Sequence, residues 1–195
     1  MTKIIAFSGR KQSGKSTAGE FISSFIQASG IETSHKIYSF ADPLKQDICM
    51  NILGMSHSQC YGSDDDKNTM TDLEWNGEKL TARRAMEVIG TNIFRQIKRQ
   101  VWVEATINKI LRENLDLAII VDCRFPNEVD AILDIKGHVI RLDLDPFHSD
   151  SDSEKALDPE YYDWNRFSCV INNSAMTAEG KNHEILKFIR AKNLL

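Results

Sequence analysis

The sequence has little of several features that would place it in a specialised class. It has four cysteines in 195 residues, at positions 49, 60, 123 and 169, and no two of them have the spacing of a metal-ligand pair. We therefore expect reduced thiols. No apolar run approaches the roughly 20 residues that a membrane helix needs, and the run at residues 4–8 is too short for a signal peptide. We expect a cytoplasmic protein with no membrane partner.

A basic excess is also missing, because the formal net charge is −4. A positive field that could hold a nucleic-acid polymer is therefore not expected, whereas small phosphorylated substrates need only local positive charge. Apolar residues make up 42% of the chain and charged residues 27%, as in ordinary globular proteins. With 195 residues, we expect a single domain over positions 1–195.

The apolar runs predict a parallel sheet. Strands are expected at residues 4–8, 36–40, 117–122, 138–142 and 168–171, and the first and third are apolar on both faces. Helix-period segments lie between them, at residues 16–29, 43–53, 81–89, 92–114, 126–135 and 177–192. This alternation predicts an α/β fold of three layers. Residues 54–79 and 143–166 do not fit it, and long irregular segments are usually functional lids or disordered.

One motif carries a defined chemistry. Residues 9–16 read GRKQSGKS, which satisfies the pattern of a phosphate-binding loop, between an apolar strand and an amphipathic helix. Glycines let the backbone turn so that N–H groups point at an anion, and the helix adds its positive end. A chance match is the alternative. The residues expected around the phosphates are Gly9, Arg10, Lys11, Gln12, Ser13, Gly14, Lys15, Ser16 and Thr17.

A second polar position follows the third predicted strand. Asp122 ends the run LAIIVD, where an acid could hold Mg²⁺ together with Ser16. Arg124 would lie in the same crevice at the carboxyl edge of the sheet. The alternatives are an N-cap role for Asp122 in the helix from Pro126, and a surface ion pair for Arg124.

Positive charge gathers at residues 83–99, where Glu87 is the only acid among Arg83, Arg84, Arg95, Lys98 and Arg99. Such a local excess predicts an anion site, because guanidinium groups bind phosphate through two hydrogen bonds. We expect Gly90 to break the helix, and Trp102 to stack on a base. A solvated basic helix with a core tryptophan is the alternative.

Polar residues elsewhere add weaker candidates. Asp42 and Lys45 follow the second predicted strand at the edge of the cleft, although an N-cap and a surface charge are equally good interpretations. Asn173 could contact an adenine edge or cap the last helix. Residues 143–163 carry eight acids and one lysine, with no arginine before Arg166, so we expect gating or positioning there and not phosphate clamping.

Taken together, these residues resemble the deoxynucleoside monophosphate kinases of tailed bacteriophages. The shared segments cover most of the chain, and the most specific are those at residues 80–104 and 121–128. All the shared segments, in chain order, read SGRKQSGKST, FADPLK, LTARRAMEVIGTNIFR, VWVE, VDCRFPNE and HSDSDSEKAL. In the last segment His148, Ser153 and Glu154 match only loosely.

The resemblance implies a P-loop kinase fold with a five-stranded parallel sheet in the order 2-3-1-4-5. It implies Mg²⁺-dependent transfer of the ATP γ-phosphate to a deoxynucleoside monophosphate, with Lys15 and Ser16 serving ATP and Mg²⁺. The acceptor would bind within residues 42–104, and residues 143–166 would be lid-like. The residues implied around the acceptor are Asp42, Lys45, Arg83, Arg95, Trp102, Arg124, Glu128, Ser153 and Glu154.

The hypothesis is therefore in-line phosphoryl transfer, in which charge and positioning do most of the catalysis. Lys15 and Arg124 would stabilise the transferred group, and Arg95 would hold the acceptor phosphate. Two alternatives stay open: another small-molecule P-loop kinase, such as a dephospho-coenzyme A kinase, and a non-catalytic nucleotide-binding protein. A homodimer is also left open.

Overall fold

The computed structural model describes residues 2–146 and 152–195. The chain divides into two compact units, the first formed by residues 1–40 and 107–195 and the second by residues 41–106. The segment expected to bind the acceptor, residues 42–104, thus folds as the second unit. Each unit is described below by itself.

The first unit is built on a five-stranded sheet. Its strands are β1 (Lys3–Ser8), β2 (His35–Tyr38), β5 (Leu117–Cys123), β6 (His138–Leu142) and β7 (Cys169–Ile171), and every pairing between them is parallel. With the strands numbered along the whole chain, their order in the sheet is β2-β5-β1-β6-β7. These numbers differ from the expected 2-3-1-4-5 because β3 and β4 form a separate hairpin. Counted within this sheet alone, the neighbours follow the order 2-3-1-4-5.

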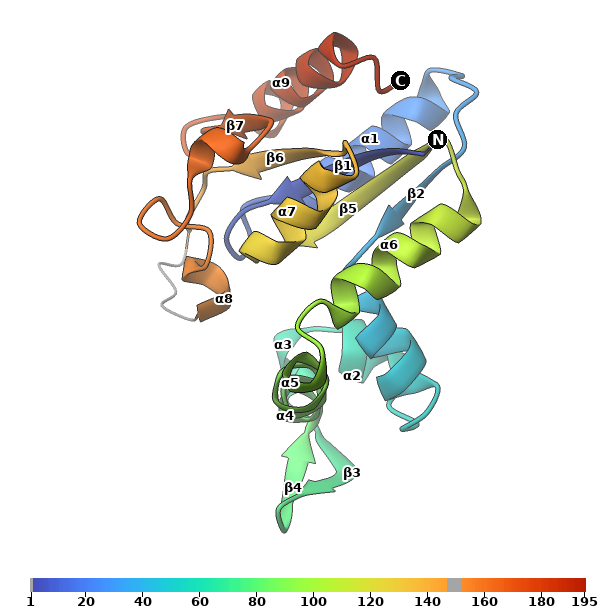
Figure 1. The fold of residues 1–195 in the computed structure, drawn as a ribbon, viewed down its shortest axis with the longest axis vertical. Coiled ribbons are helices and arrows are strands. Elements are labelled where there is room, and N and C mark those ends of the chain that lie inside the picture. The colour runs from blue at the N-terminus through green and yellow to red at the C-terminus, as the bar shows by residue number, and fades with distance from the viewer. Residues whose placement is uncertain (1, 147–151) are drawn as a thin grey trace. The chain divides into compact units, whose positions relative to one another are not determined.

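Helices cover both faces of this sheet (Figure 1). On one face, α1 (Lys15–Ala28) and α9 (Ala178–Ala191) bury an apolar stripe against alternate residues of the strands. On the other face lies α7 (Pro126–Asp134), and Figure 1 shows it crossing the sheet opposite α1. Residues 107–113 of α6 (Val101–Glu113) also belong to this unit. Among the described helices, none is long and apolar enough to cross a membrane.

The register of the parallel strands brings three loops to one edge of the sheet. Ser8, the last residue of β1, pairs with Cys123 near the end of β5 and with Arg141 near the end of β6. Because parallel strands point the same way, the segments that follow all three begin side by side. This edge carries the phosphate-binding loop.

The second unit is mostly helical with one hairpin. Its elements are η1 (Pro43–Met50), α2 (His57–Tyr61), α3 (Asp64–Lys67), β3 (Met70–Trp75), β4 (Glu78–Thr81), α4 (Ala82–Glu87), η2 (Val88–Phe94) and α5 (Arg95–Ile97). They share a small apolar core whose buried members are Cys49, Met55, Cys60, Leu80, Ala82, Ala85 and Val88.

Residues 54–79 form two short helices and a hairpin in this unit, whereas the sequence suggested a long irregular segment. Two short helices begin with capping boxes, in which Ser56 and Ser63 bond the backbone of Gln59 and Asp66. The hairpin turns at Asn76 and Gly77, which both have positive φ. These are short-range signals that a search for long apolar periods overlooks.

Two helix predictions in this unit were wrong. Gly90 does not break the helix, because α4, η2 and α5 follow one another without an extended residue, and η2 is a π-helix. The break comes instead at Lys98, which is extended, so residues 92–114 are not one helix. A Cβ on Gly90 would lie 2.7 Å from a methyl of Leu44, so glycine serves close packing against η1.

Capping of the last helix offers a stability test. The Thr177 side chain accepts a hydrogen bond from the Gly180 N–H at the start of α9. Thr177→Ala leaves that donor without its side-chain partner, so we expect a loss of about 1 kcal/mol in the free energy of unfolding. Urea denaturation measures it, with Thr33→Ala in the α1–β2 loop as the matched control, expected to change stability by less than about 0.5 kcal/mol. Equal losses in both variants would contradict the capping role.

Candidate active site

The loop between β1 and α1 has the backbone that its motif predicts. Gly9 and Gly14 have φ of 154° and 95°, and Gln12 has φ of 58°. A Cβ on Gly9 would lie 2.3 Å from Ser13 Oγ and 2.7 Å from the Leu142 carbonyl oxygen. Only glycine fits there, because the chain folds back on itself against the end of β6. The loop is therefore shaped by sterics before any ligand arrives.

Lys15 is the first residue of α1, and its side chain is buried under the loop. Its Nζ donates to the carbonyl oxygens of Gly9 at 2.8 Å and Arg10 at 2.6 Å. Burial, followed by the positive charge of Arg124, lowers the pKa of Lys15 to about 8. The ammonium group thus lies where anionic oxygens would stabilise its charge.

Asn173 supports the same loop from the segment after β7. Its Nδ2 donates to the Ser13 carbonyl oxygen at 3.0 Å, and the residue is buried. It does not cap the last helix, as one interpretation held, because Thr177 does so. Within the described part of the chain, the buried Ser13 Oγ and Asn173 Oδ1 have no hydrogen-bond partner. Such orphan polar atoms are unusual and favour a polar ligand nearby. An adenine contact by Asn173 stays a prediction.

The two residues predicted to hold a metal lie at the same sheet edge. Ser16 is exposed in the first turn of α1. Asp122 accepts hydrogen bonds from the Ser39 hydroxyl and, at 2.8 Å, from the Phe40 N–H. The suggested N-cap role of Asp122 is wrong, because the N-cap of α7 (Pro126–Asp134) is Phe125, and the Asp122 carboxylate instead bonds the residues that follow β2. No group of three or more His, Cys, Asp or Glu side chains in residues 2–146 and 152–195 forms a ready-made metal site.

Arg124 follows β5 and is held at both ends. Its backbone N–H donates to Glu128 Oε2 at 2.7 Å, and its Nη1 donates to Glu154 Oε1 at 2.5 Å. Glu128 also accepts from the Phe125 N–H at 3.1 Å, so this buried carboxylate caps the start of α7. The ion pair suggested for Arg124 exists, but its partner is a buried acid and not a surface one.

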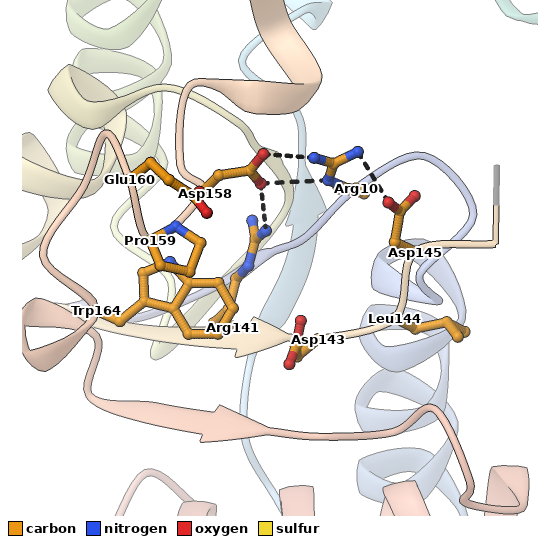
Figure 2. A pocket seen from close by; sticks show the side chains of 9 residues that line it. All are labelled: Arg10, Arg141, Asp143, Leu144, Asp145, Asp158, Pro159, Glu160 and Trp164. Atoms are coloured by element: carbon orange, nitrogen blue, oxygen red, sulfur yellow. Dashed lines mark hydrogen bonds and ion pairs between the residues drawn. The ribbon is translucent and has the colours of Figure 1, made fainter. Parts of the chain in front are cut away.

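Arg10 forms one wall of a pocket of about 350 Å³ beside the loop (Figure 2). Its Nη1 lies 2.9 Å from Asp145 Oδ2, and its Nε donates to Asp158 Oδ1 at 3.2 Å. The bond to Asp158 raises the pKa of Arg10. Two acids of the lid-like segment thus fix the first side chain of the phosphate loop.

Arg141 is a polar residue of this site that sequence reasoning missed. It lies buried in β6, donates to Ser8 Oγ at 3.3 Å, and its guanidinium lies 5.2 Å from the centroid of the Trp164 ring. Burial lowers its pKa. A charged residue inside the apolar run HVIRL was the available signal.

Glu154, in the short helix α8 (Asp152–Lys155), is buried and reaches the phosphate loop. Besides Arg124, its carboxylate accepts from the Lys11 N–H. For Ser153 the structure describes the backbone alone, and His148 lies outside the described residues, so their predicted contacts stay predictions.

Comparison with known proteins fits this geometry. A family model described as deoxynucleotide monophosphate kinase matches residues 56–175, more than half of the chain. The chain belongs to the deoxynucleotide monophosphate kinase family.

A viral relative agrees with this assignment, and a solved structure shares the fold. A protein of Acanthamoeba polyphaga mimivirus, named provisionally as a deoxynucleotide monophosphate kinase, is 29% identical over 159 residues, covering 75% of this chain and 77% of its own. Shikimate kinase from Acinetobacter baumannii, solved with shikimate, shares the fold with a TM-score of 0.51 at 12% identity, over 100% of this chain and 97% of its own. Because the first relative is from a giant virus, a bacteriophage origin stays a prediction.

The second unit of this kinase carries most of the acceptor candidates. Asp42 Oδ1 accepts from the Tyr61 hydroxyl at 2.8 Å, and Lys45 Nζ lies 4.5 Å from the centroid of the Tyr61 ring. Tyr61 of α2 thus contacts both Asp42 and Lys45, although these residues lie much earlier in the chain, at the start of η1. Tyr61 carried no sequence signal, because only the fold of α2 against η1 brings it there.

The basic residues of this unit differ in exposure. Arg83 is exposed and pairs with Asp64 at 2.7 Å, whereas Arg95 is half-buried. Trp102 is 6% exposed, donates its Nε1–H to the Gly90 carbonyl oxygen at 3.1 Å, and packs on Phe94 with ring centroids 5.2 Å apart. This burial agrees with the alternative of a core tryptophan, so stacking of Trp102 on a base would require it to leave its present contacts.

Two variants of Glu128 can distinguish its role in capping α7 from a role in binding substrate. Glu128→Gln keeps a carbonyl oxygen that can accept from Arg124 and Phe125, whereas Glu128→Ala leaves two backbone donors without their acceptor. We expect the alanine variant to lose about 1–3 kcal/mol in the free energy of unfolding, and the glutamine variant to lose much less. Chemical denaturation with acceptor KM measurements would test this. A normally stable glutamine variant with a strongly raised KM would show a substrate role instead.

Proposed function

We propose that this kinase transfers the γ-phosphate of ATP to a deoxynucleoside monophosphate, in a reaction that depends on Mg²⁺. The observation that carries the proposal is Lys15 buried beneath a glycine-shaped phosphate loop, in a chain of the deoxynucleotide monophosphate kinase family. The oxygen of the acceptor phosphate attacks the γ-phosphorus, the bond from that phosphorus to the β–γ bridging oxygen breaks, and ADP leaves. No general base is needed, because the attacking oxygen is already anionic.

Residues of the first unit would hold the donor. The loop N–H groups and Lys15 surround the phosphates, and Arg124 stabilises the negative charge on the transferred group. Arg124 is suited to this role because it lies close enough to Lys15 to lower that residue's pKa. Arg141, buried in the neighbouring strand, acts on the same lysine and adds a third positive charge to this region.

The oxygen donors at the sheet edge fit a magnesium ion. Mg²⁺ prefers one or two carboxylates together with substrate phosphates and water, and does not need a protein cage. Ser16 and Asp122 would hold it, and the bonds from Ser39 and Phe40 keep the Asp122 carboxylate in place. When bound, Mg²⁺ would offset charge on the phosphate oxygens.

Residues of the second unit would hold the acceptor. Arg95 is our choice for the acceptor phosphate, since guanidinium matches phosphate geometry. Asp42 and Lys45 would act together because Tyr61 contacts both, so a change at Tyr61 should disturb the two at once.

The decisive test is a coupled ADP-release assay with dTMP, dGMP, dCMP, dAMP and dephospho-coenzyme A. We expect turnover with at least one deoxynucleotide, and a loss of at least about 10²-fold in kcat for Lys15→Ala, because the variant lacks the cation at the phosphates. Absence of turnover with every deoxynucleotide would contradict the proposal.

A fold control belongs with that variant. Lys15→Ala removes two internal hydrogen bonds as well as a charge, so its circular dichroism and unfolding midpoint must be compared with the parent protein. Retention of near parental turnover by a folded Lys15→Ala variant would mean that the loop does not serve the transferred phosphate.

The low pKa of Lys15 predicts a pH-dependent affinity for ATP. Without ligand the Lys15 pKa is about 8, and phosphates next to the ammonium would raise it. Binding then takes up a proton, so the affinity should be constant below pH 7 and fall as pH rises through 8, by up to about tenfold per unit. Calorimetry from pH 7 to 9.5 would measure this.

Lys15→Arg provides the matched control for the pH profile. Arginine stays charged throughout this range, so its ATP affinity should lose the slope whatever its absolute value. A slope that persists in the arginine variant would assign the titration to another group.

A further inference from the structure

A carboxylate of the chain itself lies on the phosphate-binding loop. Glu154 Oε2 accepts from the backbone N–H of Lys11, within the loop, and Oε1 accepts from Arg124 Nη1 at 2.5 Å. The residue is only 7% exposed, so this is an enclosed contact and not a surface one. A backbone that turns its N–H groups inward selects an anion. The anion it holds here comes from the protein.

The cations meant for phosphate are therefore already partnered within the first unit. Lys15 Nζ is bonded to two loop carbonyls, and Arg124 is bonded to Glu154. Arg10 is paired with Asp145 and Asp158, as Figure 2 shows. All three carboxylates come from residues 143–166, the acidic segment that carries no arginine before Arg166. Its charge is thus complementary to the loop and equal in sign to a nucleotide.

We propose that Glu154 is an internal anion that occupies the phosphate-binding loop in the nucleotide-free enzyme and that a phosphate of the donor must displace. This inference rests on the proposed function and adds a regulatory element to the same site. Donor binding becomes an exchange of one anion for another at Lys11 and Arg124. Small anions that cannot compensate for the lost Glu154 contacts are excluded, and Glu154 leaves Lys11 and Arg124 only when a polyphosphate arrives.

If Glu154 competes with phosphate, its removal should raise the affinity for phosphate, which a purely structural role of Glu154 would not predict. Hydrogen bonds to a charged carboxylate are about twice as strong as neutral ones, so Glu154 competes with an incoming phosphate. The two donors approach different oxygens of Glu154, so the single amide oxygen of Glu154→Gln can take the place of only one of them. Removing the competitor should therefore tighten phosphate binding.

The test measures binding of ATP and of inorganic tripolyphosphate by calorimetry. Tripolyphosphate lacks a nucleoside, so it reports on the loop alone. We expect its Kd to fall by about tenfold in Glu154→Gln, the change that 1.4 kcal/mol produces. Glu154→Ala should move the Kd in the same direction and serves as a second variant if the amide disturbs the fold.

Glu32→Gln is the matched control. It makes the same change in chemistry and net charge, but at an exposed position beyond the far end of α1, a helix of 14 residues and so about 21 Å long. Its Kd for tripolyphosphate should stay within about twofold of the parent value, because exposed charges at that distance are screened.

An unchanged or weakened Kd in both Glu154 variants would overturn the inference, as would an equal gain in the Glu32 variant. A loss of kcat in Glu154→Gln at unchanged Kd would show instead that Glu154 stays in place and orients Arg124. Failure of the proposed function looks different, because the parent protein would then bind neither ligand, or Lys15→Ala would bind both equally well. If the parent binds ATP through Lys15 and the Glu154 variants match it, only this inference fails.

Discussion

The turn at Gly9 is the constraint on which the candidate site depends. A side chain there would collide with both Ser13 and the end of β6, so the backbone must pass through a region that glycine alone occupies easily. That turn brings the first residue of α1 back beneath the loop and lets Lys15 bond the Gly9 and Arg10 carbonyls. The register of β1 with β5 and β6 then brings Arg124 and Arg141 to the same sheet edge.

The positive side chains gathered at this edge of the sheet repel one another, and carboxylates from the acidic segment lie next to them. Lys15 lies among other cations, and its low pKa records both its burial and their repulsion. Glu154 offsets part of that repulsion, and Asp145 and Asp158 pair with Arg10 in the same loop. The negative charge of this segment does not favour nucleotide binding, but it is complementary to the cations of the phosphate-binding loop.

In the second unit, close packing of helices positions the candidate residues. Gly90 lets η1 approach the long helix formed by α4, η2 and α5, and the π-helical turn presents a carbonyl to the Trp102 indole. These contacts bury the tryptophan that the sequence suggested for base stacking. The small apolar core around Cys49 and Cys60 places Tyr61 against Asp42 and Lys45.

The sequence by itself determined the five strands of the sheet, most of the flanking helices and the phosphate loop, because apolar periodicity and the requirement for glycine are local properties. The residues at strand ends, Asp122 and Arg124, followed from the same reasoning. Partners far apart in the chain could not be derived in this way. That Asp122 holds the exit of β2, that Arg141 lies beside the loop and that Glu154 occupies it are outcomes of tertiary structure, since each depends on which loops the folded sheet brings to one edge.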